Sequence, residues 1–202
     1  MKSLLLLLVL PVLFSSFTII DRYELTDAER KFAVDHLNKT RDDLINSVKG
    51  LSDAQLNFKT APDRWSVLEC VQHITLTSAG LVGFVQQTLK TPNDSAFKPT
   101  VTDEQFIAMV EDRTHKAQAA EPFKPVHAPY KTLDETLKTF NAGRDSLITY
   151  MQTTPDDLRA HIAVLPFAKV DAYQLVLLIS AHTNRHMQQL NEVKADPNFP
   201  KQ

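Results

Sequence analysis

The sequence predicts an all-α protein: a four-helix bundle with a long crossover connection and one additional helix or helical turn. Five segments carry apolar residues at helical spacing, and four of them begin with a capping-box signal. The chain has only four glycines, which disfavours a β-sandwich or a β-barrel. The best strand candidate, residues 161–170, is split by Pro166 and has no evident partner, so we expect a loop there.

The N-terminus predicts a signal peptide over residues 1–18. Lys2 precedes an apolar run from Leu4 to Phe14, and small polar residues follow this run. No Ala-x-Ala site is present, so cleavage after Ser15 or Thr18 is an expectation from the order of the regions alone. The segment predicts export to the periplasm or secretion. An uncleaved anchor is the alternative, and only in that case do we expect the protein to lie at a membrane.

The five helical segments follow in one domain, residues 22–200. They are 26–50, 66–90, 102–118, 132–151 and 171–195. The first four begin with the capping-box pairs Thr26 and Glu29, Ser66 and Glu69, Thr102 and Gln105, and Thr132 and Glu135. The connections between the segments are long for an up-and-down bundle, so at least one of them is expected to cross an end of the bundle.

Charge and cysteine content exclude several classes of protein. The formal net charge is −2, so there is no basic surface of the kind that binds nucleic acid. Cys70 is the only cysteine, so the chain has no internal disulfide and its stability must come from a packed core. We interpret Cys70 as a buried core residue, with a nucleophile as the alternative.

Three histidines are candidate metal ligands. His182 and His186 are four residues apart on one face of the last helical segment, one turn from each other. The spacing alone also fits two unrelated surface histidines. A third ligand has to come from a neighbouring helix, and His73 in the second long segment is the candidate. Three imidazoles that leave one position open for water are typical of a catalytic zinc site.

Two stretches carry a resemblance to a known family. "DRWSVLECVQHITLT" resembles the Trp-Ser-x-x-Glu-x-x-x-His signature of DinB-like four-helix-bundle proteins, and "HTNRHMQQLNEVKADPNFP" is similar to the last helix of that family. The resemblance implies that His73, His182 and His186 bind a divalent metal ion: zinc, nickel or iron. It also implies a metal-dependent hydrolase acting on an unknown small molecule, and a homodimer.

The family resemblance leaves other functions open. Some relatives transfer small thiols and others are isomerases, and a non-catalytic dimerising bundle is a further alternative. An export signal favours hydrolysis over thiol transfer, because exported compartments are oxidising and hold little reduced thiol.

Several nearby residues have two interpretations each. Glu69 either closes its capping box or reaches His73 one turn on. Trp65 either seals the end of the bundle or stacks on a substrate, and Gln189 either points at a substrate or is exposed. For Arg185 we expect a surface or dimer salt bridge. The remaining histidines, His36, His115, His127 and His161, are expected to be packed or solvated rather than ligands.

Overall fold

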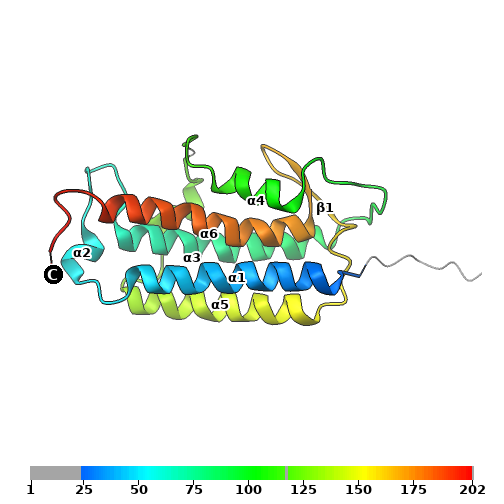
Figure 1. Ribbon diagram of the computed structural model, residues 1–202, viewed down its shortest axis with the longest axis horizontal. Helices are drawn as coiled ribbons and strands as arrows, with labels where there is room; N and C mark the ends of the chain where they lie inside the picture. The colour runs from blue at the N-terminus through cyan, green and yellow to red at the C-terminus, as the bar shows by residue number, and fades with distance from the viewer. Residues whose placement is uncertain (1–23, 117, 202) are drawn as a thin grey trace, which may run out of the picture.

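Four long helices lie side by side in the computed structural model, which describes residues 24–116 and 118–201 (Figure 1). They are α1 (Asp27–Val48), α3 (Val67–Thr88), α5 (Leu133–Thr153) and α6 (Ala172–Lys194). The all-α four-helix bundle predicted from the sequence is confirmed. The predicted signal peptide, residues 1–18, lies outside the described residues.

The order of the helices around the bundle differs from their order in the chain. Helix α1 packs against α5 and α6, and α3 packs against the same two helices. Helices α1 and α3 therefore occupy opposite corners, as do α5 and α6. Figure 1 shows that α1 and α6 run in one direction and α3 and α5 in the other.

The predicted crossover lies between α3 and α5. Because these two helices run in the same direction, the chain must return along the bundle between them. Helix α4 (Asp103–Glu111) makes this return and packs along α6. Two short 3-10 helices, η1 (Glu121–Phe123) and η2 (Pro125–His127), then contact α3. Helix α4 is the predicted additional helix, but it ends at Glu111 instead of continuing to residue 118.

All four predicted capping boxes are present. The hydroxyl groups of Thr26, Ser66, Thr102 and Thr132 each accept from the backbone N–H three residues on, at 3.2 Å. A fifth box, Ser52 with Gln55, begins the short helix α2 (Asp53–Asn57). This helix was not predicted from the sequence because five residues are too few to show an apolar stripe.

The loop predicted for residues 161–170 is wrong. Strands β1 (Ile162–Val164) and β2 (Lys169–Asp171) form an antiparallel pair in which Ile162 faces Asp171 and Val164 faces Lys169. The partner of the strand is therefore the second half of the same stretch. Pro166 falls in the turn between the strands, where no ladder hydrogen bond from its nitrogen is needed.

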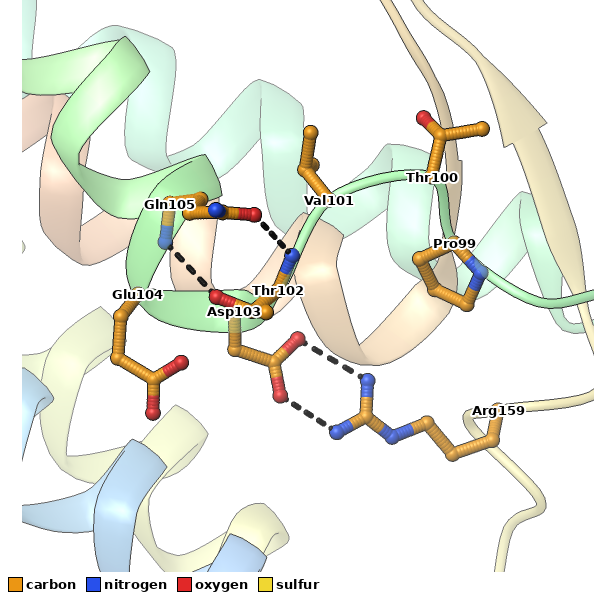
Figure 2. Close-up of a pocket in the computed structure, with 8 residues that line it drawn as sticks. All are labelled: Pro99, Thr100, Val101, Thr102, Asp103, Glu104, Gln105 and Arg159. Atoms are coloured by element: carbon orange, nitrogen blue, oxygen red, sulfur yellow. Dashed lines mark hydrogen bonds and ion pairs between the residues drawn. The ribbon is translucent and has the colours of Figure 1, made fainter.

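Arg159 joins the starts of three helices. Its guanidinium group pairs with Glu29 in the first turn of α1 at 2.8 Å, with Asp103 at the start of α4 at 2.7 Å, and with Asp171, the N-cap of α6, at 3.0 Å. Figure 2 shows the Asp103 carboxylate facing the guanidinium group. Both residues line a hollow of about 370 Å³. Carboxylates at helix N-termini are favourable, and one cation here links three of them.

Helix α3 carries much of the core. It is long and apolar enough to span a membrane by composition alone, yet it packs between α5 and α6 inside the bundle. Its Cys70 is fully buried, as predicted for a core residue. The face of α3 that meets α6 is the face that carries His73.

Candidate metal centre

Three imidazoles converge between α3 and α6. The Nε2 atoms of His73 and His186 lie 3.1 Å apart, and those of His186 and His182 also lie 3.1 Å apart. One nitrogen atom from each ring lies within 4.8 Å of the other two. The structure thus brings together the three histidines that the sequence singled out. No second group of three or more His, Cys, Asp or Glu side chains is similarly arranged in residues 24–116 and 118–201.

The backbone explains the convergence. His182 and His186 are separated by one turn of α6, so their rings project from one face of that helix. Helix α3 packs against this face and supplies His73 from its second turn. The ring centroids of His73 and His186 are 4.3 Å apart, and those of His182 and His186 are 4.4 Å apart.

Hydrogen bonds fix the proton positions on two of the rings. His73 Nδ1 lies 2.7 Å from the backbone carbonyl oxygen of Phe123, which can only accept, so Nδ1 carries the proton. His186 Nδ1 lies 3.0 Å from Gln189 Oε1. Arg113, which can only donate, contacts the same amide oxygen at 3.3 Å and thereby sets the orientation of the amide. Both rings therefore present an unprotonated Nε2 to the centre.

Facing lone pairs make the centre suitable for a cation. With both Nδ1 atoms protonated, the Nε2 atoms of His73 and His186 have no hydrogen between them, although they are 3.1 Å apart. Such an arrangement is repulsive unless a positive charge lies between the nitrogens. Two nitrogens bound at about 2.0–2.1 Å to one tetrahedral zinc ion are about 3.3–3.4 Å apart. The donor set and its spacing therefore fit a divalent metal ion.

Burial keeps the imidazoles neutral. His73 is 3% exposed, and the other two rings are at most partly exposed. Burial lowers the pKa of all three histidines, with the neighbouring imidazoles adding to the effect on the two α6 residues, and the pKa of His182 falls to about 3. Neutral imidazole is the form that binds metal, so the site is already deprotonated at neutral pH.

Trp65 forms one wall of the centre. Its ring centroid lies 4.6 Å from that of His73 and 6.0 Å from that of His186. Trp65 also packs against the core cluster that contains Leu44 and Val67, which agrees with the predicted seal, and its stacking on a substrate stays a prediction. Glu69 closes its capping box with Ser66 and pairs with Lys59 at 2.8 Å, so it serves the cap rather than His73.

The crossover connection supplies two contacts that were not predicted from the sequence. The Phe123 carbonyl group contacts His73, and Arg113 contacts Gln189. A backbone carbonyl has no residue signature, and Arg113 lies in the polar run 111–116 at the end of the predicted segment 102–118, where nothing indicates a partner 76 positions away. The salt bridge expected for Arg185 is absent from the described residues. Arg185 donates instead to the backbone carbonyls of Val110, Asp112 and His115, which satisfies acceptors at the end of α4.

The other four histidines lie outside the cluster. His36 Nδ1 lies 2.7 Å from Ser180 Oγ, and its Nε2 is 3.8 Å from Glu111, so it packs where α1, α4 and α6 meet. His115, His127 and His161 are exposed or lie in loops, as predicted. The two described hollows, the one beside Arg159 and a groove of about 1350 Å³ along α3 and α5, are not lined by the three converging histidines.

The fold and the site together define a four-helix bundle whose three buried or partly buried histidines could hold a metal ion. The sequence profile of the DinB superfamily matches residues 36–190, and the chain belongs to this family. The resemblance seen in the two sequence stretches is thereby confirmed.

Two relatives from Bacillus subtilis are similar to the chain. The uncharacterised protein YuaE of strain 168 is 23% identical over 158 residues, which are 78% of this chain and 94% of YuaE. The solved structure of YfiT superimposes with a TM-score of 0.57 at 14% identity, over 86% of this chain and 90% of YfiT. YfiT is described as "a probable metal-dependent hydrolase with an unusual four-helix bundle topology". At this identity the likeness shows the fold alone.

Proposed function

We propose that the protein is a metal-dependent hydrolase that holds one divalent ion through His73, His182 and His186. The observation that carries this proposal is the pair of unprotonated Nε2 atoms of His73 and His186 facing each other at 3.1 Å. The description of YfiT as a probable metal-dependent hydrolase supports the same assignment. Zinc, nickel and iron all suit an all-imidazole donor set.

The residues of the chain have distinct tasks in this proposal. A divalent ion at such a site supplies Lewis-acid activation of water and of the scissile group. The three Nε2 atoms would hold the ion, and a three-histidine donor set is of the kind that lets water or substrate bind as well. The Phe123 carbonyl and Gln189 hold the rings of His73 and His186 in the binding tautomer. Trp65 shields one side of the two rings from water.

Metal analysis of single variants tests the ligand assignment. The purified protein should contain about one equivalent of a divalent ion after exposure to zinc or nickel and removal of the excess. His73→Ala, His182→Ala and His186→Ala should each lose most of this metal. His115→Ala is the matched control, because the His115 side chain is 95% exposed and lies outside the cluster. Full occupancy in all three ligand variants would refute the assignment.

Activity measurements test the reaction class. The reconstituted protein should cleave a member of an ester, amide and phosphoester panel, and a chelator should abolish this cleavage. The same panel is repeated with an added small thiol and an electrophilic acceptor, since a thiol transferase consumes the thiol and a hydrolase does not. Turnover that depends strictly on thiol would replace hydrolysis with transfer, and metal binding without any turnover would favour a non-catalytic bundle.

Export and self-association complete the proposal. The order of charged, apolar and small residues in positions 1–18 supports export to the periplasm or secretion, with an uncleaved anchor as the alternative. Cell fractionation with N-terminal sequencing distinguishes a processed chain from an anchored one. The proposed homodimer is tested by light scattering of the purified protein, in which a mass near the monomer value of 22.8 kDa would exclude it.

A further inference from the structure

Phe123 lies directly on the backbone of α3. A Cβ atom placed on Gly80 would come within 2.5 Å of Phe123 Cε1 and 2.7 Å of Phe123 Cζ. Both distances are far shorter than a normal carbon–carbon contact of about 3.5–4.0 Å. The aromatic ring therefore occupies space that only a glycine leaves open.

The same residue touches α3 at a second point. The backbone carbonyl of Phe123 accepts from His73 Nδ1 at 2.7 Å. His73 and Gly80 are seven residues apart, which is two turns of α3, so both lie on one side of that helix. The ring of Phe123 contacts one of these positions while its carbonyl group holds the other.

The segment around Phe123 is stiff enough to link the two contacts. Phe123 closes the 3-10 helix η1, in which its backbone N–H donates to Ala120 at 2.9 Å. Pro122 and Pro125 flank this position and fix the backbone φ angle on both sides. An added Cβ atom at Gly80 forces the ring to move, and any part of that movement not taken up by rotation of the Phe123 side chain shifts the backbone of this segment and the carbonyl group with it.

We propose that Gly80 is a positioning residue of the metal centre, which seats Phe123 so that its carbonyl holds His73 in the Nδ1–H tautomer with Nε2 directed at the ion. This inference rests on the proposed metal-binding function. It assigns to the crossover connection a role in the site besides joining α3 to α5. Gly80 acts only through Phe123 and touches neither metal nor substrate.

Gly80→Ala is the test, with Gly83→Ala as its matched control. Gly83 lies one turn further along α3, and a Cβ atom there meets nothing within 4 Å. Both changes add the same methyl group to the same helix, and each favours helix formation to the same extent. We expect Gly80→Ala to weaken zinc binding by about 10–100-fold, as for other losses of a ligand-orienting contact, and Gly83→Ala to leave it unchanged.

Two further measurements separate positioning from general damage. Nitrogen-15 NMR of the metal-free protein should show His73 as the Nδ1–H tautomer in the wild type and in Gly83→Ala, but as a tautomer mixture in Gly80→Ala. Adding Phe123→Leu to Gly80→Ala removes the clash while keeping the backbone carbonyl, so it should recover part of the lost affinity. If Gly80→Ala does not fold, Phe123→Ala is the alternative. It removes the contact between the Phe123 ring and Gly80 without adding atoms, and it should also lower zinc affinity.

The outcomes separate this inference from the proposed function. Equal zinc affinity and equal His73 spectra in Gly80→Ala and Gly83→Ala would overturn the positioning role while leaving the metal site standing. If Gly80→Ala does not fold, an unchanged zinc affinity in Phe123→Ala would likewise overturn the positioning role and leave the metal site standing. A wild type that binds no divalent ion overturns the proposed function, and the tautomer spectra of the metal-free protein still decide whether Gly80 and Phe123 control His73.

Discussion

The Nε2 atoms of His73 and His186 lie 3.1 Å apart although the two residues are 113 positions apart in the chain and belong to different helices. Each ring has its other nitrogen engaged, His73 by the Phe123 carbonyl and His186 by Gln189. No hydrogen bond can therefore form between the Nε2 atoms of His73 and His186. The lone pairs of the two Nε2 atoms face each other, and a cation between them would relieve their repulsion.

Gln189→Leu should weaken metal binding by about 10–100-fold without removing a ligand, because it deletes the acceptor that orients His186. Zinc affinity measured by chelator competition is the readout. Gln188→Leu is the control, since the neighbouring Gln188 amide donates to the Glu111 carbonyl instead and contacts none of the three histidines. Equal affinity in both variants would show that the contact between Gln189 and His186 has no orienting effect.

Arg159→Leu should lower the free energy of unfolding by about 3–5 kcal/mol, because it leaves buried carboxylates without their cation. Asp171 is fully buried in its pair with Arg159, and it also caps α6. Urea denaturation measures the loss. The control is Lys31→Ala, which removes an ion pair with Asp35 whose side chains are 75% and 61% exposed, and should change the stability by less than about 0.5 kcal/mol. Similar losses in both variants would contradict the role given to Arg159.

Arg144→Met should leave the stability unchanged or increase it, by up to about 1–4 kcal/mol. Burial lowers the pKa of Arg144, so its charged form is less favourable in the folded chain than in the unfolded one. Its hydrogen-bond partners are the Leu37 carbonyl and the hydroxyls of Thr40 and Thr183, none of which carries a charge. Both hydroxyls keep their own backbone acceptors after the change. A loss of more than about 2 kcal/mol in urea would show that the three hydrogen bonds outweigh the desolvated charge.

Cys70 should resist alkylation in the native protein up to at least pH 10. Burial raises the pKa of its thiol to about 12, and the thiolate is the reactive form. Because the unfolded chain loses this proton near the ordinary value of 9.0, native stability should also fall as the pH rises above that value. Iodoacetamide labelling followed by mass spectrometry, with and without urea, is the measurement. Rapid native labelling at pH 8 would contradict the burial of this side chain.

The helices were predictable because two local signals agreed. Apolar residues at helical spacing and the capping pairs at Thr26, Ser66, Thr102 and Thr132 marked the same boundaries. Short elements escaped this reasoning. The hairpin at residues 162–171 pairs with itself across a turn that contains Pro166, and three-residue strands are too short to show alternation.

The three converging histidines were predictable, but the groups that orient them were not. His182 and His186 share a helix face, and the motif around His73 resembles a known family. Both features consist of side chains, so they can be recognised in the sequence. The partner of His73 is a backbone carbonyl, which any residue at position 123 would provide. The role of Gly80 depends on a contact across 43 positions that exists only after the crossover has packed on α3. Neither the contact between the Phe123 carbonyl and His73 nor the contact between the Phe123 ring and Gly80 can be inferred from sequence periodicity.

The separation of the proposed ligands between α3 and α6 would tie metal affinity to the folding equilibrium. An unfolded chain would have to close a loop of more than one hundred residues to bring His73 to His186, so an ion held by the proposed site would bind the native state with strong preference. Saturating metal at about 100 times its dissociation constant then adds about 2.7 kcal/mol to the unfolding free energy. The thermal midpoint of the protein should therefore depend on the free metal concentration, so that the melting temperature itself reports occupancy of the centre.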